Sequence, residues 1–238
     1  MRRLRAAFAF LTIVPPGRSA EGLELAAGLP FFPVVGFLVG GIAGLVAELA
    51  GPHLGAFAGA ALALLSQVLL TRNLHWDGLF DTIDGLLALP REQSLAAMRD
   101  PRIGGGAAVG GAIALVLFVA LVAGMPPPHL PLALAAAGMA GRGAVAGAVA
   151  LFPYARAEGL GKAFAGKSGT GLAVFIVTLA ALAALLGLPG AIAAGLTLAL
   201  VLLGGRYAVR RFGGCTGDVY GALEVLTEIL VLACMVWR

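Results

Sequence analysis

Three aspartates stand close together in an otherwise apolar stretch, HWDGLFDTIDGL at residues 75–86. Asp77, Asp81 and Asp84 are spaced at i, i+4 and i+7, so on a helix all three lie on one face. Like charges at this spacing destabilise a helix, and no basic residue lies between Arg72 and Arg91 to offset them. The stretch is therefore expected to need a cation from outside the chain.

Mg²⁺ is the cation that these side chains suit best. Clustered carboxylates are hard oxygen ligands, and Mg²⁺ usually binds one or two of them together with water and substrate phosphates. The sequence thus predicts a metal site at Asp77, Asp81 and Asp84, and the alternative is a solvated face paired with arginines of the same loop. His75 is a candidate for proton transfer, although a hydrogen-bonded histidine at the membrane interface explains it equally well.

The stretch MRDPRIGGGAAVGG at 98–111 is a candidate anion site. Arg99 and Arg102 can grip phosphate oxygens, and the glycines leave backbone N–H groups accessible to the same oxygens. Asp100 would either join the metal or orient an arginine. A glycine-rich start of a membrane helix is also common packing, so this prediction gains its weight from the aspartates nearby.

Two further stretches combine charged residues with glycine, YARAEGLGKAFAGKSGTG at 154–171 and GGCTGDVYGALEVLTE at 213–228. Carboxylates inside apolar segments are costly and are functional hypotheses by default. The alternative for them is a structural ion pair with Arg142, midway along an apolar segment, or with Arg206. The substrate-binding candidates from these stretches are Arg142, Arg156, Lys162, Lys167, Asp218, Glu224 and Glu228.

The elements that must position these residues are membrane helices. The chain of 238 residues is 60% hydrophobic and 12% charged, whereas an ordinary soluble domain carries about 25% charged residues. A mean hydropathy of +0.99 over the whole chain excludes a water-soluble fold. The abundant glycine and alanine, interspersed with leucine and valine, are typical of closely packed helices in a bilayer.

Seven apolar runs approach the length of about 17 to 25 residues that a spanning helix needs. They lie at 31–50, 54–71, 105–125, 130–151, 171–188, 190–204 and 219–237. We therefore predict an all-α, polytopic membrane bundle of about seven helices that forms a single domain over 1–238. An interfacial segment at 1–30 and motif loops at 72–104, 152–170 and 205–218 complete it.

Basic residues indicate how the bundle is oriented, because lysine and arginine accumulate on the cytoplasmic side. The N-terminal arm and the three motif loops hold 14 of the 16 basic residues, whereas the alternate connections hold none. This predicts a cytoplasmic N-terminus in a multi-pass inner-membrane protein. Asp77, Asp81, Asp84 and Asp218 fall on the same side, so the active site is expected on the cytoplasmic face.

Taken in order, the motifs resemble the cobalamin synthase family, also called adenosylcobinamide-GDP ribazoletransferase. The matching pieces are FLTIVP at 10–15, FFPVVGFLVG at 31–40, HWDGLFDTIDG at 75–85, MRDPRIG at 98–104, YARAEGLGKAF at 154–164 and GGCTGDVYGALEVLTE at 213–228. One departure is Phe80, where a small residue such as alanine is expected. Another is the GGGAAVGG run after Arg102, which lacks the polar residue expected in that loop.

The resemblance implies a Mg²⁺-dependent transferase of vitamin B12 assembly in the cytoplasmic membrane. Such an enzyme joins adenosylcobinamide-GDP to α-ribazole or its 5′-phosphate and releases GMP. On this reading Asp77, Asp81 and Asp84 hold the metal, and one of them, Asp84 by a small margin, accepts the proton of the attacking hydroxyl. Phosphates would meet Arg99, Arg102, Lys162 and Lys167.

Two other functions fit parts of the sequence. A CDP-alcohol-phosphotransferase-like enzyme also clusters aspartates with glycine at the cytoplasmic face, but its pattern has an Ala-Arg pair that residues 80–82 lack. A small ion-coupled transporter could use buried carboxylates, but no internal repeat is visible and the acidic residues collect on one side. The expected partners are the two substrates and membrane lipid, with no nucleic acid. A homo-oligomer or an assembly with other B12-biosynthesis enzymes stays open.

Overall fold

The computed structural model describes residues 2–14, 22–89, 91–164 and 168–236, and within them the chain is helical. The longer helices are α3 (Phe32–Leu54), α4 (Ala56–Thr71), α5 (Leu74–Leu87), α7 (Gly105–Ala123), α8 (Leu130–Leu151), α9 (Ser168–Phe212) and α10 (Gly217–Val236). The shorter ones are α1 (Arg2–Leu11), α2 (Gly22–Gly28) and α6 (Ser94–Ala97), with 3₁₀ turns that include η4 (Leu160–Phe164). No β-strand occurs in these ranges, so the predicted all-α fold is confirmed.

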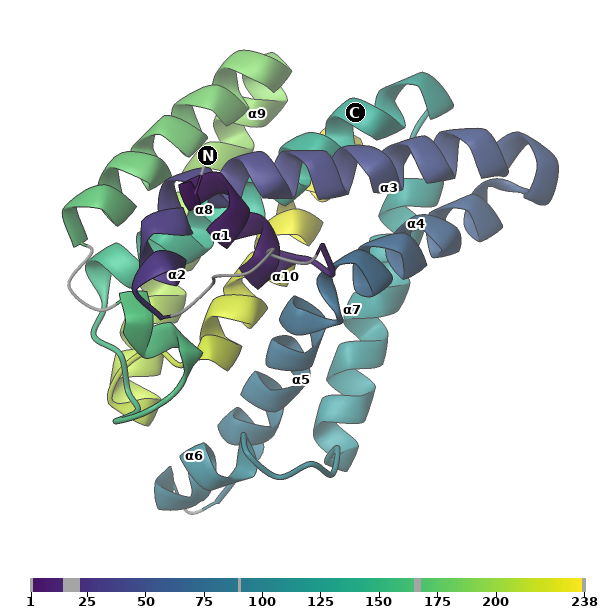
Figure 1. The fold of residues 1–238 in the computed structure, drawn as a ribbon. Helices are drawn as coiled ribbons and strands as arrows, with labels where there is room; N and C mark the ends of the chain where they lie inside the picture. Colours follow the sequence, from purple (N-terminus) through teal and green to yellow (C-terminus); the bar gives the residue numbers. More distant parts are fainter. Residues whose placement is uncertain (1, 15–21, 90, 165–167, 237–238) are drawn as a thin grey trace.

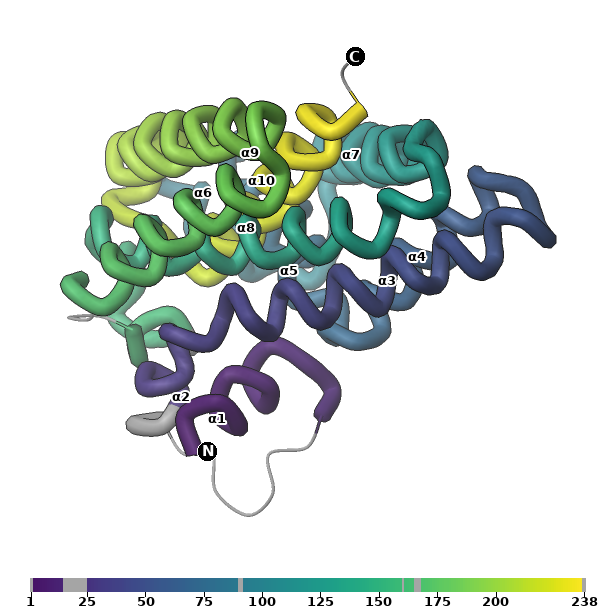
Figure 2. The backbone as a smooth tube through the Cα atoms, turned by 90° about the horizontal axis from the view of Figure 1, so that it is seen from above, coloured from purple at the N-terminus to yellow at the C-terminus, as the bar shows by residue number. Residues whose placement is uncertain are grey.

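Helix α8 is the central element, with α3, α9 and α10 packed around it (Figures 1 and 2). Its sequence is dominated by alanine and glycine, and every residue from Ala133 to Val149 is buried. On α3, Gly36, Gly40 and Gly44 recur every fourth residue, and a Cβ at any of them would overlap the backbone of α8. The absent side chains let the two backbones approach closely, as small residues do in membrane bundles.

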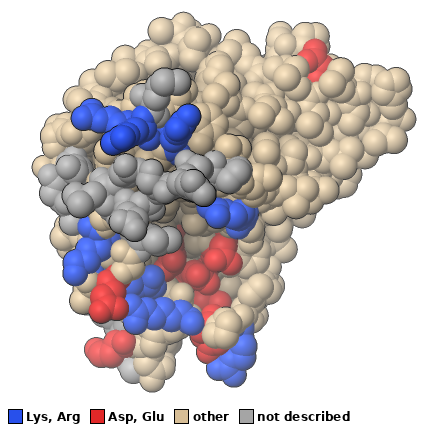
Figure 3. Space-filling view, in the orientation of Figure 1, with Lys and Arg blue, Asp and Glu red and all other residues tan. Residues whose placement is uncertain are grey.

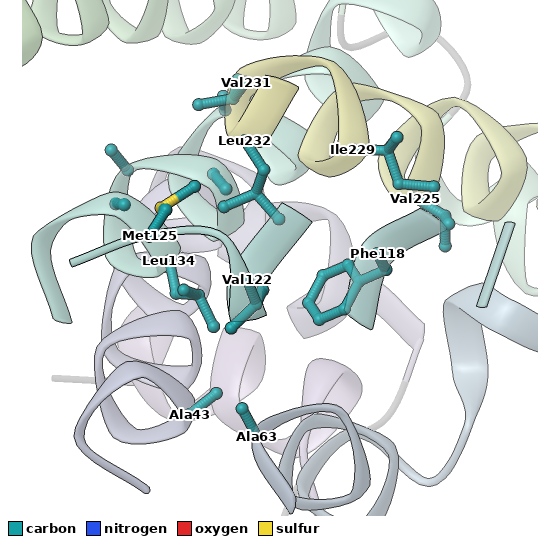
Figure 4. Packing of buried hydrophobic residues seen from close by; sticks show 14 of the residues in the cluster. Ala43, Ala63, Phe118, Val122, Met125, Leu134, Val225, Ile229, Val231 and Leu232 are labelled. Carbon is teal, nitrogen blue, oxygen red and sulfur yellow. The ribbon is translucent and has the colours of Figure 1, made fainter. Parts of the chain in front are cut away.

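A second layer of the core joins α7 and α10 (Figure 4). Phe118 and Val122 of α7 lie among Val225, Ile229 and Leu232 of α10, and all five side chains are buried. This packing brings α10 alongside α8 and α7 together. The opposite faces of the outer helices carry exposed leucine, isoleucine and valine, as expected of surfaces in contact with lipid.

The length and composition of a membrane span are met by five helices in the described chain. A sixth would be α4 and α5 taken together, although the two helices are bent by 92°. Helix α4 has 16 residues, about 24 Å, and does not reach across the hydrocarbon core alone. The predicted second span at 54–71 is therefore part of a broken element, and the predicted total of seven is not confirmed.

Helix α9 is broken at Gly187, which has φ 62° and ψ −137° and is followed by Pro189. The chain folds back there (Figures 1 and 2), so that Gly171 and Gly205, near its two ends, both lie against the last turns of α8 or Phe152 just after it. This break lies close to the turn predicted between 188 and 190. The second leg continues to Phe212, which corrects the predicted end at 204 and makes the first part of the predicted loop 205–218 helical.

The corner between α4 and α5 positions the aspartates. Arg72 and Asn73 both have left-handed backbone angles, with φ of 54° and 61°. Two such residues in succession end α4 and change the direction of the chain without a glycine. The Arg72 guanidinium donates hydrogen bonds to the carbonyls of Ala9 and Phe10, at 3.2 and 3.3 Å, and so ties α1 to the corner.

We expect Gly40→Ala to destabilise the protein, because its methyl group would overlap the carbonyl oxygen of Leu134. Overpacking of this kind costs about 1–3 kcal/mol, which thermal unfolding in detergent would show as a lower midpoint. Gly41→Ala is the matched control, since its Cβ lies 3.7 Å from that of Ala135, an ordinary contact. Equal midpoints for the two variants would contradict the close crossing of α3 and α8.

Candidate active site

Charged side chains gather at one end of the molecule and leave the apolar helices almost bare (Figure 3). The predicted aspartate helix is α5, and its buried side packs against α10 and α7. Asp77 is exposed, whereas Asp81 and Asp84 are half-buried. An open hollow of about 450 Å³, here called the charged groove, is lined by Asn73, Asp77, Phe80, Asp81, Met98, Arg99, Asp100, Pro101, Arg102 and Ile103.

Asp84 lies against the start of α7. Its Oδ2 accepts a hydrogen bond from the backbone N–H of Gly104, at 2.9 Å. Gly104 is the residue that precedes α7, so the carboxylate satisfies an N–H at the positive end of that helix. The glycine is needed there because a Cβ would overlap the Asp84 carboxylate. Asp84 therefore fixes the beginning of α7 with one of its oxygens.

A fourth aspartate, Asp218, joins the aspartate face from the first turn of α10. That helix is capped by Thr216, whose Oγ1 accepts a hydrogen bond from the N–H of Val219 at 3.2 Å. Gly78 on α5 lies against the backbone of Asp218, and the two helices cross closely there. The charges of Asp218 and Asp77 both repel that of half-buried Asp81, whereas Arg156 attracts it.

The carboxylates suit a Mg²⁺ ion that takes its other ligands from water and substrate, and not a site in which the protein supplies every ligand. In the described chain no group of three or more histidine, cysteine, aspartate or glutamate side chains is placed to hold a metal ion by itself. The carboxylates of Asp77 and Asp81, however, make no hydrogen bond or ion pair with any described residue. Two free carboxylates are sufficient for Mg²⁺ when water and phosphate oxygens supply its other ligands.

Asp100 and Arg102 form a bidentate pair at the edge of the charged groove. The guanidinium Nε and Nη2 lie 2.9 and 2.6 Å from the two carboxylate oxygens. These hydrogen bonds from Arg102 lower the pKa of Asp100 to about 2. Of the two predicted roles for Asp100, the structure shows the orientation of an arginine. Arg99 is exposed on the same groove.

The motif segments around 154–164 and 213–218 lie side by side. A bridge joins Tyr154 to Cys215, in which the N–H of Ala155 and the carbonyl of Cys215 are 2.8 Å apart. Arg156 then reaches Asp218, with 2.7 Å between Nη2 and Oδ2. Lys162, in η4, donates to the carbonyl of Ala157 and is exposed. Lys167 lies outside the described residues.

Buried charges link α5, α8 and α10 beneath the site. Arg142 is 2% exposed, and its Nη1 contacts the carboxylates of both Glu224 and Glu228, which are equally buried. Its Nη2 lies 3.4 Å from Nδ1 of His75. The structural alternative, pairing of the two glutamates with Arg142, is therefore confirmed. The four residues lie in the core and not on the charged groove.

Two contacts that hold α5 in place were not predicted from the sequence. The Arg211 guanidinium, from the end of α9, donates to the carbonyls of Gly85, Leu86 and Ala88 at the end of α5. A cation at this position satisfies free carbonyls and opposes the helix dipole. The unexpected Phe80 is accommodated by Gly111 on α7, since a Cβ there would overlap the phenyl ring.

Arg142→Met would leave two carboxylates buried without their cation. Breaking a buried ion pair in this way costs about 3–5 kcal/mol, so we expect a much lower unfolding midpoint in detergent. Adding Glu224→Gln and Glu228→Gln to the same variant should recover most of the loss, because the uncompensated charges are then removed. Arg102→Met, at an 87% exposed side chain, should leave the midpoint unchanged. A wild-type midpoint for Arg142→Met alone would disprove the role of the buried charges.

Comparison with known proteins agrees with the motifs. A sequence model of the family described as cobalamin-5-phosphate synthase matches residues 3–236. An adenosylcobinamide-GDP ribazoletransferase of Desulforamulus reducens is 39% identical over 236 residues, which cover 96% of this chain and 94% of the relative. One of Klebsiella pneumoniae is 40% identical over 242 residues, which cover 97% of each chain. No solved structure matches the chain.

Proposed function

The chain belongs to the cobalamin-5-phosphate synthase family, and we propose from this membership that it is an adenosylcobinamide-GDP ribazoletransferase. In this reaction a ribose hydroxyl of α-ribazole, or of its 5′-phosphate, attacks the phosphorus that carries the cobinamide arm. The bond from that phosphorus to the bridging oxygen breaks, and GMP leaves with the bridging oxygen. The structural observation that supports the proposal is the pair of carboxylates, Asp77 and Asp81, that have no partner among the described residues and lie in a groove edged by arginines.

The diphosphate of the donor would lie in the charged groove. Arg99 and Arg102 are exposed there, and Asp100 holds the Arg102 guanidinium in place. Positive charge at this position stabilises the negative charge that develops on the leaving GMP. The backbone N–H groups of Gly105 and Gly106, at the start of α7, are exposed next to Arg102 and can take further phosphate oxygens.

Asp77 and Asp81 would hold the metal, because neither is engaged by a described residue. Mg²⁺ bound there would polarise the phosphoryl oxygens and neutralise their charge. The proton of the attacking hydroxyl needs a carboxylate within reach. Asp84 still has its Oδ1 free of protein partners in the described chain, and Asp81 is the other candidate.

The site would face the cytoplasm from the inner membrane. Support comes from the charge distribution, since the basic residues of the described chain collect at the end of the molecule that carries the aspartates (Figure 3). Substrates that carry phosphates would then be reached without crossing the bilayer.

Asp77→Asn and Asp81→Asn should each reduce GMP release by about a hundredfold or more, because an amide binds Mg²⁺ far more weakly than a carboxylate. The assay follows GMP from adenosylcobinamide-GDP and α-ribazole with purified protein, at increasing Mg²⁺. Glu92→Gln is the matched control, since Glu92 is exposed on the same side of the chain and lines neither pocket of the site. Near-normal turnover of both aspartate variants would remove the metal-site proposal.

The donor specificity separates the proposed reaction from the two other functions. We expect turnover with the GDP-linked donor and none with CDP-linked alcohols, measured in detergent without any ion gradient. Consumption of the CDP-linked donor would instead support the phosphotransferase, and absence of product from either donor would leave the transporter as the alternative.

A further inference from the structure

A second hollow lies behind the charged groove and has a different chemistry. This cavity of about 240 Å³, here called the aromatic cavity, is enclosed by α1, α5, η4 and the start of α10. Phe10, Phe32 and Phe164 form one wall, with ring centroids 5.5 to 5.6 Å apart. Tyr154 and Tyr220 form another, with centroids 6.3 Å apart. Planar ligands are favoured between such walls.

His75 and Tyr220 are buried side chains with polar atoms among the described residues that line this cavity. His75 is 6% exposed, and its Nδ1 faces the guanidinium of Arg142. A guanidinium only donates hydrogen bonds, so in a bond with Arg142 the Nδ1 atom accepts and Nε2 carries the ring proton, although Oε2 of Glu224 also lies 3.8 Å from Nδ1. No hydrogen bond between described residues occupies Nε2. The cavity therefore offers a ligand the ring N–H of His75 and the hydroxyls of Tyr154 and Tyr220 among apolar side chains.

We propose that the aromatic cavity binds the planar nitrogen base of the acceptor nucleoside, with the Nε2–H of His75 donating to its free ring nitrogen. This inference rests on the proposed function and assigns the acceptor to a subsite separate from the donor. An azole base has one exposed ring nitrogen that accepts a hydrogen bond and otherwise apolar edges, which matches the cavity.

Guanine of the donor fits the same cavity poorly. Its ring carries several N–H groups, and burying them without acceptors costs about 1–3 kcal/mol for each unsatisfied group. Of the carboxylates that line the cavity, Asp218 is already paired with Arg156, and Asp77 is assigned to the metal by the proposed function.

The position of the cavity suits the transfer. Asp77 lines both the aromatic cavity and the charged groove. A base held in the cavity would place its attached ribose at this shared boundary, where the hydroxyl meets the diphosphate. The two substrates then meet at one carboxylate, which holds the attacking hydroxyl close to the phosphorus.

Gly217→Leu tests the assignment by placing a larger side chain at the exposed edge of the cavity. Gly217 lines it, and a Cβ there meets no atom within 4 Å, so the larger side chain enters open space. We expect the KM for α-ribazole to rise about tenfold or more while the KM for adenosylcobinamide-GDP stays within about twofold. Gly195→Leu, on an exposed face of α9 with equally open space, is the matched control.

The outcomes of this experiment separate the two proposals. A rise in the KM for the donor alone would place guanine in the cavity and overturn the inference. Unchanged constants for both substrates would also overturn it, with the proposed function intact. Absence of turnover in the wild-type protein would instead contradict the proposed function.

A matched pair of acceptors tests the hydrogen bond from His75. One is α-ribazole, and the other is an analogue with C–H in place of the free ring nitrogen. In equilibrium titrations the wild-type protein should bind α-ribazole about tenfold more tightly than the C–H analogue. A tenfold difference in Kd is what one good hydrogen bond contributes. His75→Leu should bind both with equal affinity. Discrimination that survives in His75→Leu would show that another group contacts the ring nitrogen.

Discussion

Neutralising Arg142 is the constraint on which the arrangement of the helices depends. A guanidinium in the middle of an apolar bundle is tolerable only with anionic partners in direct contact. Glu224 and Glu228 supply them from α10, and His75 lies beside them from α5. These contacts join the three helices in the register that the structure shows. That register also sets the rotation of α5, which turns Asp77 and Asp81 outward, away from the core.

Glycine makes the same register physically possible. Gly78 of α5 faces the backbone of Asp218, and Gly221 of α10 faces the carbonyl of His75, so each helix lacks a side chain where the other crosses it. Without this approach the carboxylate of Asp218 would stand apart from the aspartates of α5. The glycine that follows Asp77 in the motif therefore serves packing, whereas the carboxylates of Asp77 and Asp81 have no hydrogen-bond partner among the described residues.

Periodicity, composition and charge were sufficient to predict the helical membrane fold, the aspartate face of α5 and the turn near Gly187. The 92° corner was not predictable, because Arg72 and Asn73 adopt left-handed angles without the glycine that normally signals them. The bond from Gly104 to Asp84 and the cap by Arg211 join residues far apart in sequence, where spacing carries no information. The aromatic cavity was not predicted for the same reason, since its lining residues come from α1, α3, α5, α8, the segment 154–164 and the start of α10.

The three phenylalanine rings of that cavity have a consequence for the evolution of the fold. Phe10, Phe32 and Phe164 belong to α1, α3 and η4, yet each ring touches the other two. A larger or smaller residue at one position leaves a clash or a void that the other two must absorb. Homologues with a different residue at one of these positions are therefore expected to differ at all three. Substitutions in the N-terminal helix would then be correlated with substitutions in a segment more than a hundred residues away.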